Sequence, residues 1–265
     1  MSLKIIQLSD CHVSASPDAV YRGIDPRATL QSLLPRVRDW SPDLVLLTGD
    51  LAEDASAGAY AFLRDALAKI DAPVISIPGN HDDPAGQGRY FPATATETPL
   101  VRIAKGWKLI MLNSAAEGRI EGVLSEAMLE GLGTALRQAP VPTMVVLHHQ
   151  PVPTDSPWID RYALREPEAF WSIIDQYESV RAVCWGHIHH DFEALRGEVC
   201  LLGAPSTSRN SLARQKRFTG DPAGPAARWF ELGADGRLGT GLLRPSAPGQ
   251  QYPENDVNED AGERC

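Results

Sequence analysis

Short apolar runs rich in β-branched residues recur along this chain, each four to eight residues long and each ending in small or polar residues. Such runs suit strands that are buried on both faces of a sheet. Segments with apolar residues at three- and four-residue spacing, the period of an amphipathic helix, lie between several of them. Strands that alternate with helices predict an α/β fold with at least partly parallel sheets. The predicted strands lie within residues 3–10, 43–50, 72–80, 107–114, 142–149, 180–187 and 197–206.

The helical pattern is clear in four segments. Ser125 has the chemistry of an N-cap for the third of them, and Pro167 stands near the start of the fourth, where proline is tolerated. The predicted helices cover residues 26–40, 57–70, 125–136 and 166–177.

The C-terminal part of the chain differs in composition. Residues 203–245 are richer in Gly, Pro and Arg and are predicted to end in antiparallel strands, with a turn at Asp235–Gly236. From Ser246 the chain is Pro-rich, acidic and nearly free of large apolar residues, which predicts disorder. No internal repeat is visible. We therefore expect one domain over residues 1–245 and an acidic, disordered tail over residues 246–265.

Charge and composition exclude some classes of function. The net charge of −9 argues against nucleic acid as a partner, because phosphate backbones require clustered Lys and Arg. A small phosphate ester stays open as a partner, since a bound metal can reverse the local field. Neither a secretory signal nor an apolar stretch near the ~18 residues of a membrane span is visible, so no stable membrane anchor is expected. The four cysteines form no paired spacing, which favours a cytoplasmic protein with free thiols, and a homodimer is left open.

The seven histidines all lie at or next to the ends of the apolar runs, and none occurs elsewhere in the chain. Ordinary surface or core histidines would be scattered, so this clustering indicates a shared role. In open α/β sheets, ligands bind beyond the carboxyl ends of the strands. We therefore expect five strand ends to converge on one site, at Asp10–His12, Gly49–Asp50, Gly79–Asp82, His148–His149 and Gly186–His189.

Spacing within these strand ends separates the candidate roles. In an extended chain residues i and i+2 point to the same side, so Asp10 and His12 share one face, as do His187 and His189. Cys11 points away and is expected to be a small buried thiol rather than a ligand.

The number of candidate ligands indicates two metal ions. His148 and His149 are adjacent and point apart, so only one of them is expected to reach a metal. A tetrahedral structural zinc needs about four ligands, whereas seven imply two ions that share a bridging carboxylate such as Asp50. Mixed imidazole, carboxylate and amide ligands suit Fe, Mn, Zn or Co better than Ca or Mg alone. Besides one of the two adjacent histidines, the candidates are Asp10, His12, Asp50, Asn80, His187 and His189.

These blocks resemble the five motifs of the calcineurin-like metallophosphoesterases, which read D-x-H, G-D, G-N-H-D/E, a histidine block and G-H-x-H. Here they stand as "DCH", "GD", "GNHD", "LHH" and "GHIH", and the likeness extends over roughly residues 4–245. Within the superfamily, "GVLSEAMLEGL", "LHHQPVP", "SPWIDRYALRE", "CWGHIHHDFEA" and "LLGAPSTS" resemble the class III cyclic nucleotide phosphodiesterases, in particular the bacterial 3′,5′-cyclic AMP phosphodiesterases. The resemblance implies an α/β fold of the four-layer αββα type, with two central mixed sheets flanked by helices.

The resemblance also implies how the candidate residues divide between two divalent transition-metal ions, with Fe or Mn expected first and Zn or Co as alternatives. The residues that would hold one ion are Asp10, His12, Asp50 and His189. The residues that would hold the other are Asp50, Asn80, His148 and His187. The residues that would contact the substrate are His12, Asp50, Asn80, His81 and His189.

The implied activity is hydrolysis of 3′,5′-cyclic AMP to 5′-AMP. A hydroxide that bridges the two ions would attack phosphorus, and His81, which holds no metal, would assist the leaving oxygen. Asp82 either orients His81 or is an ordinary turn carboxylate. Candidate walls for the nucleoside are Tyr21, Arg22 and residues 158–162, although an aromatic residue in a loop, such as Trp158, is more often a packing anchor.

Other activities of related enzymes would require different residues in these blocks. A phosphoprotein phosphatase would carry an Arg shortly after Asp50, whereas this chain reads "GDLAEDAS". A purple acid phosphatase would carry a Tyr ligand in the second block, and the second block of this chain has none. A broader phosphodiesterase for 2′,3′-cyclic nucleotides or glycerophosphodiesters could share every ligand and stays open. A non-enzymatic scaffold would be expected to have lost ligands, and all seven are present.

Overall fold

The computed structural model describes residues 2–246, which form two mixed β-sheets packed face to face between helices. The strands of the first sheet are, in spatial order, β11 (Leu238–Leu243), β10 (Ala227–Leu232), β1 (Leu3–Leu8), β2 (Leu44–Thr48) and β3 (Val74–Ile77). Those of the second sheet are β4 (Leu100–Ala104), β5 (Trp107–Met111), β6 (Thr143–Val146), β7 (Val180–Trp185), β9 (Val199–Gly203) and β8 (Phe192–Arg196).

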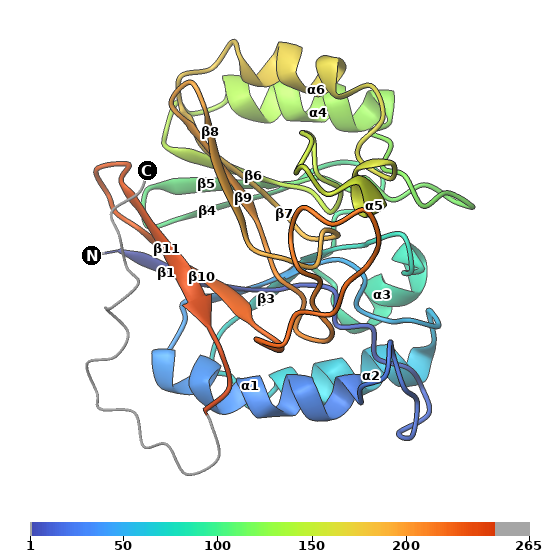
Figure 1. Cartoon of the computed structure of the whole chain (residues 1–265). Helices are drawn as coiled ribbons and strands as arrows, with labels where there is room; N and C mark the ends of the chain where they lie inside the picture. The colour runs from blue at the N-terminus through green and yellow to red at the C-terminus, as the bar shows by residue number, and fades with distance from the viewer. Residues whose placement is uncertain (1, 247–265) are drawn as a thin grey trace.

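The helices form the two outer layers of the sandwich. Figure 1 shows α1 and α2 below the sheets and α4 and α6 above them. This arrangement confirms the predicted four-layer αββα architecture. The helices are α1 (Pro26–Trp40), α2 (Ala57–Leu67), α3 (Pro84–Tyr90), α4 (Glu126–Arg137), α5 (Pro157–Asp160) and α6 (Pro167–Ile174).

All seven predicted strands form, and they make up the parallel part of the sheets. β1, β2 and β3 are mutually parallel, as are β5, β6, β7 and β9. The predicted C-terminal hairpin also forms, with β10 antiparallel to β11 and Gly236 in the turn at φ 84°. Ser125 caps α4 as expected, because its hydroxyl accepts a hydrogen bond from the amide of Met128 at 3.2 Å.

Four elements lie outside the sequence predictions. β4 and β8 are antiparallel edge strands that are largely exposed, so they lack the continuous apolar run of a buried strand. α3 contains two glycines in seven residues, and α5 is a single turn of four residues. Neither helix carries the repeated apolar spacing that predicts a helix from sequence.

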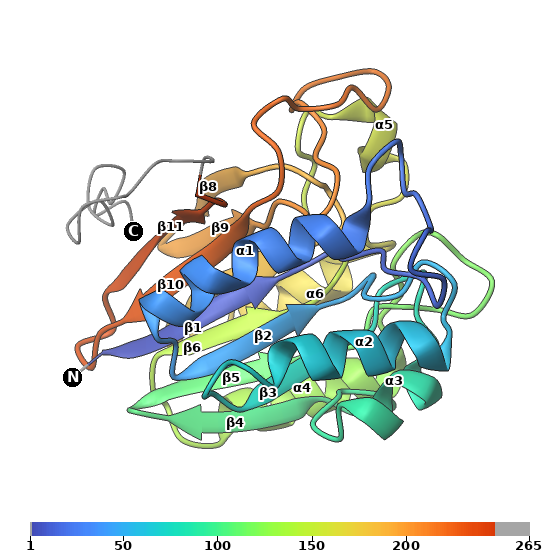
Figure 2. The same cartoon turned by 90° about the horizontal axis from the view of Figure 1, so that it is seen from below.

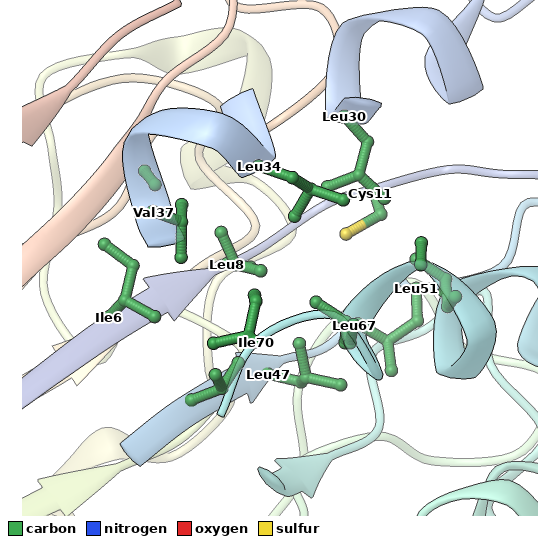
Figure 3. Close-up of a cluster of buried hydrophobic side chains, with 14 of the residues drawn as sticks. Ile6, Leu8, Cys11, Leu30, Leu34, Val37, Leu47, Leu51, Leu67 and Ile70 are labelled. Carbon is green, nitrogen blue, oxygen red and sulfur yellow. The ribbon is translucent and has the colours of Figure 1, made fainter. Parts of the chain in front are cut away.

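Three apolar layers hold the sandwich together, one under each pair of helices and one between the sheets. Figure 3 shows the layer under α1, where Leu30, Leu34 and Val37 pack on Ile6 and Leu8 of β1. Alternate β1 residues such as Leu3 and Ile5 point instead into the layer between the sheets. This period-two alternation fixes which strand residues can reach the site at the strand ends.

The parallel strands direct their carboxyl ends to one end of the sandwich. In the view of Figure 2, β1, β2 and β6 run away from the N-terminus toward the same group of loops. The five predicted ligand segments follow β1, β2, β3, β6 and β7. The fold therefore brings these segments together at that end.

The remaining sequence predictions have mixed outcomes. Cys11 is buried in the layer under α1, as expected, and burial raises the pKa of its thiol to about 12. Cys11 and Cys184 are free, but Cys200 is disulfide-bonded, so the prediction of free thiols is wrong there. Within residues 2–246 no helix has both the length and the apolar character to cross a bilayer. Except for Ser246, the tail predicted at 246–265 lies outside the described residues, and the domain boundary, cytoplasmic location and homodimer stay predictions.

Candidate metal centre

Backbone hydrogen bonds tie the strand-end loops to one another. The amides of Asp10 and His12 donate to the carbonyls of Gly49 and Asp50, each at 3.0 Å. The amide of His187 donates to both carboxylate oxygens of Asp10, at 3.1 and 3.0 Å. Because Asp10 follows β1 of the first sheet and His187 follows β7 of the second, this contact joins the two sheets at the site.

Five of the predicted ligands adopt left-handed backbone conformations. A non-glycine residue in this region costs on the order of 1 kcal/mol, and these five are among thirteen such residues within residues 2–246. The φ angles are 53° at Asp10, 47° at His12, 50° at Asp50, 65° at His187 and 53° at His189. Residues that point inward from these sharp turns can approach one another more closely than regular strands allow.

Two glycines permit this close approach. A Cβ on Gly49 would lie 2.5 Å from Nδ1 of His148, and Gly49 has a φ of 91°. A Cβ on Gly79 would lie 2.2 Å from Oδ1 of Asp50. Both contacts are far shorter than van der Waals separation, which explains glycine immediately before the Asp50 and Asn80 positions.

The first group of donors gathers Asp10, His12 and His189, all buried. Nε2 of His12 lies 3.2 Å from Nε2 of His189, which lies 3.3 Å from Oδ1 of Asp10. Oδ2 of Asp50 is 3.9 Å from Nε2 of His12. Four donors of the kinds that bind transition metals therefore face one small volume.

The second group gathers Asp50, Asn80, His148 and His187. Nε2 of His148 lies 3.4 Å from Oδ2 of Asp50, and the His148 and His187 rings are 5.1 Å apart between centroids. Three buried atoms here have no hydrogen-bond partner: Oδ1 of Asn80, Nε2 of His148 and Nε2 of His187. Buried polar atoms are rarely left unpaired, so these atoms fit a bound cation.

Asp50 stands between the two groups. Its Oδ2 faces both His12 and His148, while its Oδ1 accepts a hydrogen bond from the amide of His81 at 2.9 Å. Burial opposes ionisation of Asp50, but His148 and His12 hold its pKa well below the usual value. A buried carboxylate that stays ionised between two imidazole groups has the position and the charge of a bridging ligand.

Hydrogen bonds on the far side of the rings fix the orientation of three histidines. Nδ1 of His148 donates to the carbonyl of Thr48 at 2.7 Å, and Nδ1 of His189 donates to the carbonyl of Arg209 at 2.8 Å. A carbonyl can only accept, so each Nε2 keeps its lone pair for a metal. Nδ1 of His12 is held at 2.7 Å by Glu53.

The structure separates the adjacent histidines His148 and His149. Both ring nitrogens of His149 are engaged, Nδ1 by Ser114 at 2.8 Å and Nε2 by the carbonyl of Ile120 at 3.0 Å. Burial and the neighbouring His148 lower the pKa of His149 to about 3. In His148 burial is outweighed by Asp50, which raises the pKa of His148 to about 9, so a metal that binds Nε2 must displace its proton. Only His148 offers a free nitrogen to the site.

Glu53 is a site residue that the sequence predictions missed. Its Oε2 lies 2.7 Å from Nδ1 of His12 and 3.2 Å from Nδ1 of His81. The same carboxylate therefore contacts a candidate ligand and the predicted catalytic histidine, whose side chain is 36% exposed. The only signal in the sequence is an acidic residue three positions after Asp50.

Asp82 does not orient His81. Its carboxylate accepts hydrogen bonds from the amides of Leu51, Ala52 and Gly79 and from the hydroxyl of Tyr60, at 2.9–3.1 Å. Burial and Asp50 raise the pKa of Asp82 to about 6. Asp82 thus joins the loops that follow β2 and β3, and it positions Asp50 and Asn80 together.

An open cavity of about 360 Å³ lies over these donors. His81 lines this cavity together with five of the seven candidate ligand residues, which are His12, Asp50, Asn80, His187 and His189. The residues that form the rest of its wall are Tyr21, Arg22, Ile120, Trp158, Ile159, Arg161, Tyr162, Arg217 and Phe218. Trp158 is only 7% exposed, which is typical of a packing anchor.

Comparison with known proteins gives consistent matches. A family model described as calcineurin-like phosphoesterase matches residues 3–191. The chain is 35% identical to a 3′,5′-cyclic adenosine monophosphate phosphodiesterase of Pseudomonas aeruginosa, over 92% of this chain and 90% of the relative. It is 32% identical to the protein of that name in Escherichia coli K12, over 91% of this chain and 90% of that relative. A dimetal phosphatase structure from Danio rerio, at 12% identity, shares the fold with a TM-score of 0.64, covering 92% of this chain and 99% of that one.

The Asp82 contact predicts a stability effect at Tyr60. Tyr60→Phe removes the hydroxyl that donates to Asp82 and accepts from the amide of Asp83. We expect the free energy of unfolding to fall by about 1–3 kcal/mol, because a buried carboxylate loses a donor. Urea unfolding of Tyr90→Phe is the control, since the Tyr90 ring is 6.1 Å from that of Tyr60 and its hydroxyl has no hydrogen bond within residues 2–246. Equal stability of the two variants would contradict this role.

The adjacent histidines give a matched test of metal binding. We expect His148→Gln to lower the metal content of the reconstituted protein, because it removes a free Nε2 from the second group. His149→Gln should keep its metal, because the His149 nitrogens are bound to Ser114 and Ile120. Elemental analysis of both variants after dialysis measures this difference. Metal loss in His149→Gln with retention in His148→Gln would reverse the assignment.

Proposed function

This chain belongs to the calcineurin-like phosphoesterase family, and from that premise we propose that it hydrolyses 3′,5′-cyclic AMP to 5′-AMP at a site for two divalent transition-metal ions. The observation that supports this most directly is the pair of donor groups that share the Asp50 carboxylate. The names of the relatives supply the substrate, a cyclic nucleotide. The complete set of donors opposes a non-enzymatic role.

The two donor groups divide the proposed ligands. Fe and Mn suit the mixture of imidazole, carboxylate and amide donors, with Zn or Co as alternatives. When bound, a pair of divalent ions supplies an activated water at neutral pH and neutralises charge on the phosphodiester. The proposed ligands of the first ion are Asp10, His12, Asp50 and His189, and those of the second are Asp50, Asn80, His148 and His187.

The chain's own contribution to catalysis centres on His81. Attack by water on phosphorus breaks the bond to the ribose 3′ oxygen, which leaves as a poor leaving group and needs a proton. We assign the donor as Nε2 of His81, because Nδ1 of His81 faces Glu53 at 3.2 Å and the ring borders the cavity. Glu53 holds the His81 ring at the edge of the cavity through its contact with Nδ1. The proton on the 3′ oxygen completes 5′-AMP.

The proposed substrate is tested by a panel of phosphate esters. With the metal-reconstituted protein, we expect the highest kcat/KM on 3′,5′-cyclic AMP, compared with 2′,3′-cyclic AMP, glycerophosphoethanolamine and p-nitrophenyl phosphate. No Arg stands within ten residues after Asp50 to grip a phosphomonoester dianion, so p-nitrophenyl phosphate should be the poorest substrate. A preference for 2′,3′-cyclic AMP or the glycerophosphodiester would support the broader phosphodiesterase, and a preference for the monoester would reject both.

Leaving-group dependence tests the role of His81. We expect His81→Ala to keep its metal and to lose about 10²–10⁴-fold in the rate of cyclic AMP hydrolysis, the usual worth of a general acid. It should lose much less on bis(p-nitrophenyl) phosphate, because p-nitrophenolate leaves without a proton. His187→Ala is the comparison, and it should lose activity on both substrates together with metal. Equal losses of His81→Ala on the two substrates would make His81 a ligand or a positioning residue.

The role of Glu53 follows from the same experiment. Glu53→Gln keeps the size of the side chain but removes its charge, so it should show the substrate pattern of His81→Ala with a smaller loss. Asp54→Asn is the matched control, since Asp54 is an exposed neighbour whose carboxylate accepts hydrogen bonds from the amides of Ala15 and Ser56 and contacts neither His12 nor His81 within residues 2–246. A loss in Glu53→Gln that is the same for both substrates would show that Glu53 acts through His12 and the metal alone.

A further inference from the structure

The outer wall of the cavity has no part in the proposed chemistry at phosphorus. It is built by two loops from opposite ends of the chain, residues 9–25 after β1 and residues 204–226 between β9 and β10. Arg22 from the first loop and Phe218 from the second meet across it. The Cζ atom of Arg22 lies 4.1 Å from the centroid of the Phe218 ring.

Both loops are anchored on candidate metal ligands. The Tyr21 ring stacks on that of His12 at 4.0 Å and 7°, and its hydroxyl accepts a hydrogen bond from Nε of Arg22 at 3.0 Å. In the second loop, the carbonyl of Arg209 accepts from His189, and the amide of Ser211 donates to the carbonyl of His189 at 2.9 Å. The positions of Arg22 and Phe218 are therefore set relative to the donors that would hold the phosphate.

Phe218 lies beside the phosphate site and not in it. Its ring centroid is 6.3 Å from that of His189 and 5.2 Å from that of Trp158. A group held at Phe218 would thus be separated from phosphorus by a short spacer, as a ribose separates a base from its phosphate. Phe218 is half-buried, so one part of its ring is available to a ligand.

The wall is also cationic in an acidic protein. Arg22 and Arg217 belong to this wall and Arg161 lines the cavity from the end of α5, and within residues 2–246 none of the three is ion-paired with a carboxylate. The only carboxylate in the lining is Asp50 on the floor. Unpaired guanidinium groups beside an aromatic ring suit a ligand that is both anionic and aromatic.

We propose that Arg22 and Phe218 form the nucleobase subsite, in which the base stacks on the Phe218 ring and the Arg22 guanidinium moves to cover the exposed face of the base. The inference rests on the proposed function, because it places a cyclic nucleotide's phosphate over the donors. Every base offers a π face to such a pair. We therefore expect the subsite to favour substrates that carry a base, with little discrimination between adenine and guanine.

The test compares a substrate that has a base with one that has none. Phe218→Ala should raise the KM for cyclic AMP roughly tenfold with little change in kcat, within the range that stacking on an aromatic side chain supplies. The KM for cyclic GMP should rise by a similar factor. On methyl p-nitrophenyl phosphate, a phosphodiester without a base, kcat/KM should stay within about twofold of the unmutated protein, because no stacked base is lost. Phe218→Trp should keep a low KM for cyclic AMP.

Arg22→Ala gives an independent second variant, because the Arg22 side chain is exposed and lies outside the apolar core. It should raise the KM for cyclic AMP and spare the base-free substrate. Arg119→Ala is the matched control, since Arg119 lines a separate cavity beside α4 and α6. Equal losses on both kinds of substrate, or an unchanged KM for cyclic AMP in both variants, would overturn the subsite. An unmutated protein that cleaves the base-free diester but no cyclic nucleotide would instead overturn the proposed function and the subsite with it.

Discussion

The Asp50 carboxylate, held between imidazole groups from both sheets, is the contact on which the rest of the site depends. His12 follows β1 of the first sheet and His148 follows β6 of the second, and both face the same carboxylate oxygen. An ionised carboxylate is stable in a buried position only when charged or hydrogen-bonding partners surround it. The seam between the sheets is therefore fixed in register by electrostatics as well as by apolar packing.

This constraint accounts for the left-handed backbone and the unpaired polar atoms among the candidate ligands. Left-handed turns at Asp10, Asp50 and His187 aim side chains inward at a cost in backbone energy. The Asp82 carboxylate, with donors from two loops, offsets part of that cost. The atoms left without partners at Asn80 and His187 are those that a cation would satisfy. The fold thus gives up local stability where a metal would restore it.

The sequence predicted the parts of the molecule that repeat a strong local pattern. Buried parallel strands such as β2 read as unbroken apolar runs, and ligand residues at their ends stood out because histidine occurs nowhere else. The edge strand β4 was not predicted, because its side chains are largely exposed and do not form an unbroken apolar run. Glu53 and Phe218 were not predicted as site residues for another reason. A single acidic or aromatic residue in a loop carries no local pattern, and its role depends on its neighbours in the folded structure. Their contacts with His81 and Arg22 join residues that are far apart in the chain.

Anomalous diffraction from crystals of the protein grown with Mn²⁺ would show whether two cations share Asp50. We expect two anomalous peaks on either side of the Asp50 carboxylate, one within reach of His12 and His189 and the other within reach of Asn80, His148 and His187. A single peak, or two peaks that do not both adjoin Asp50, would contradict a shared carboxylate.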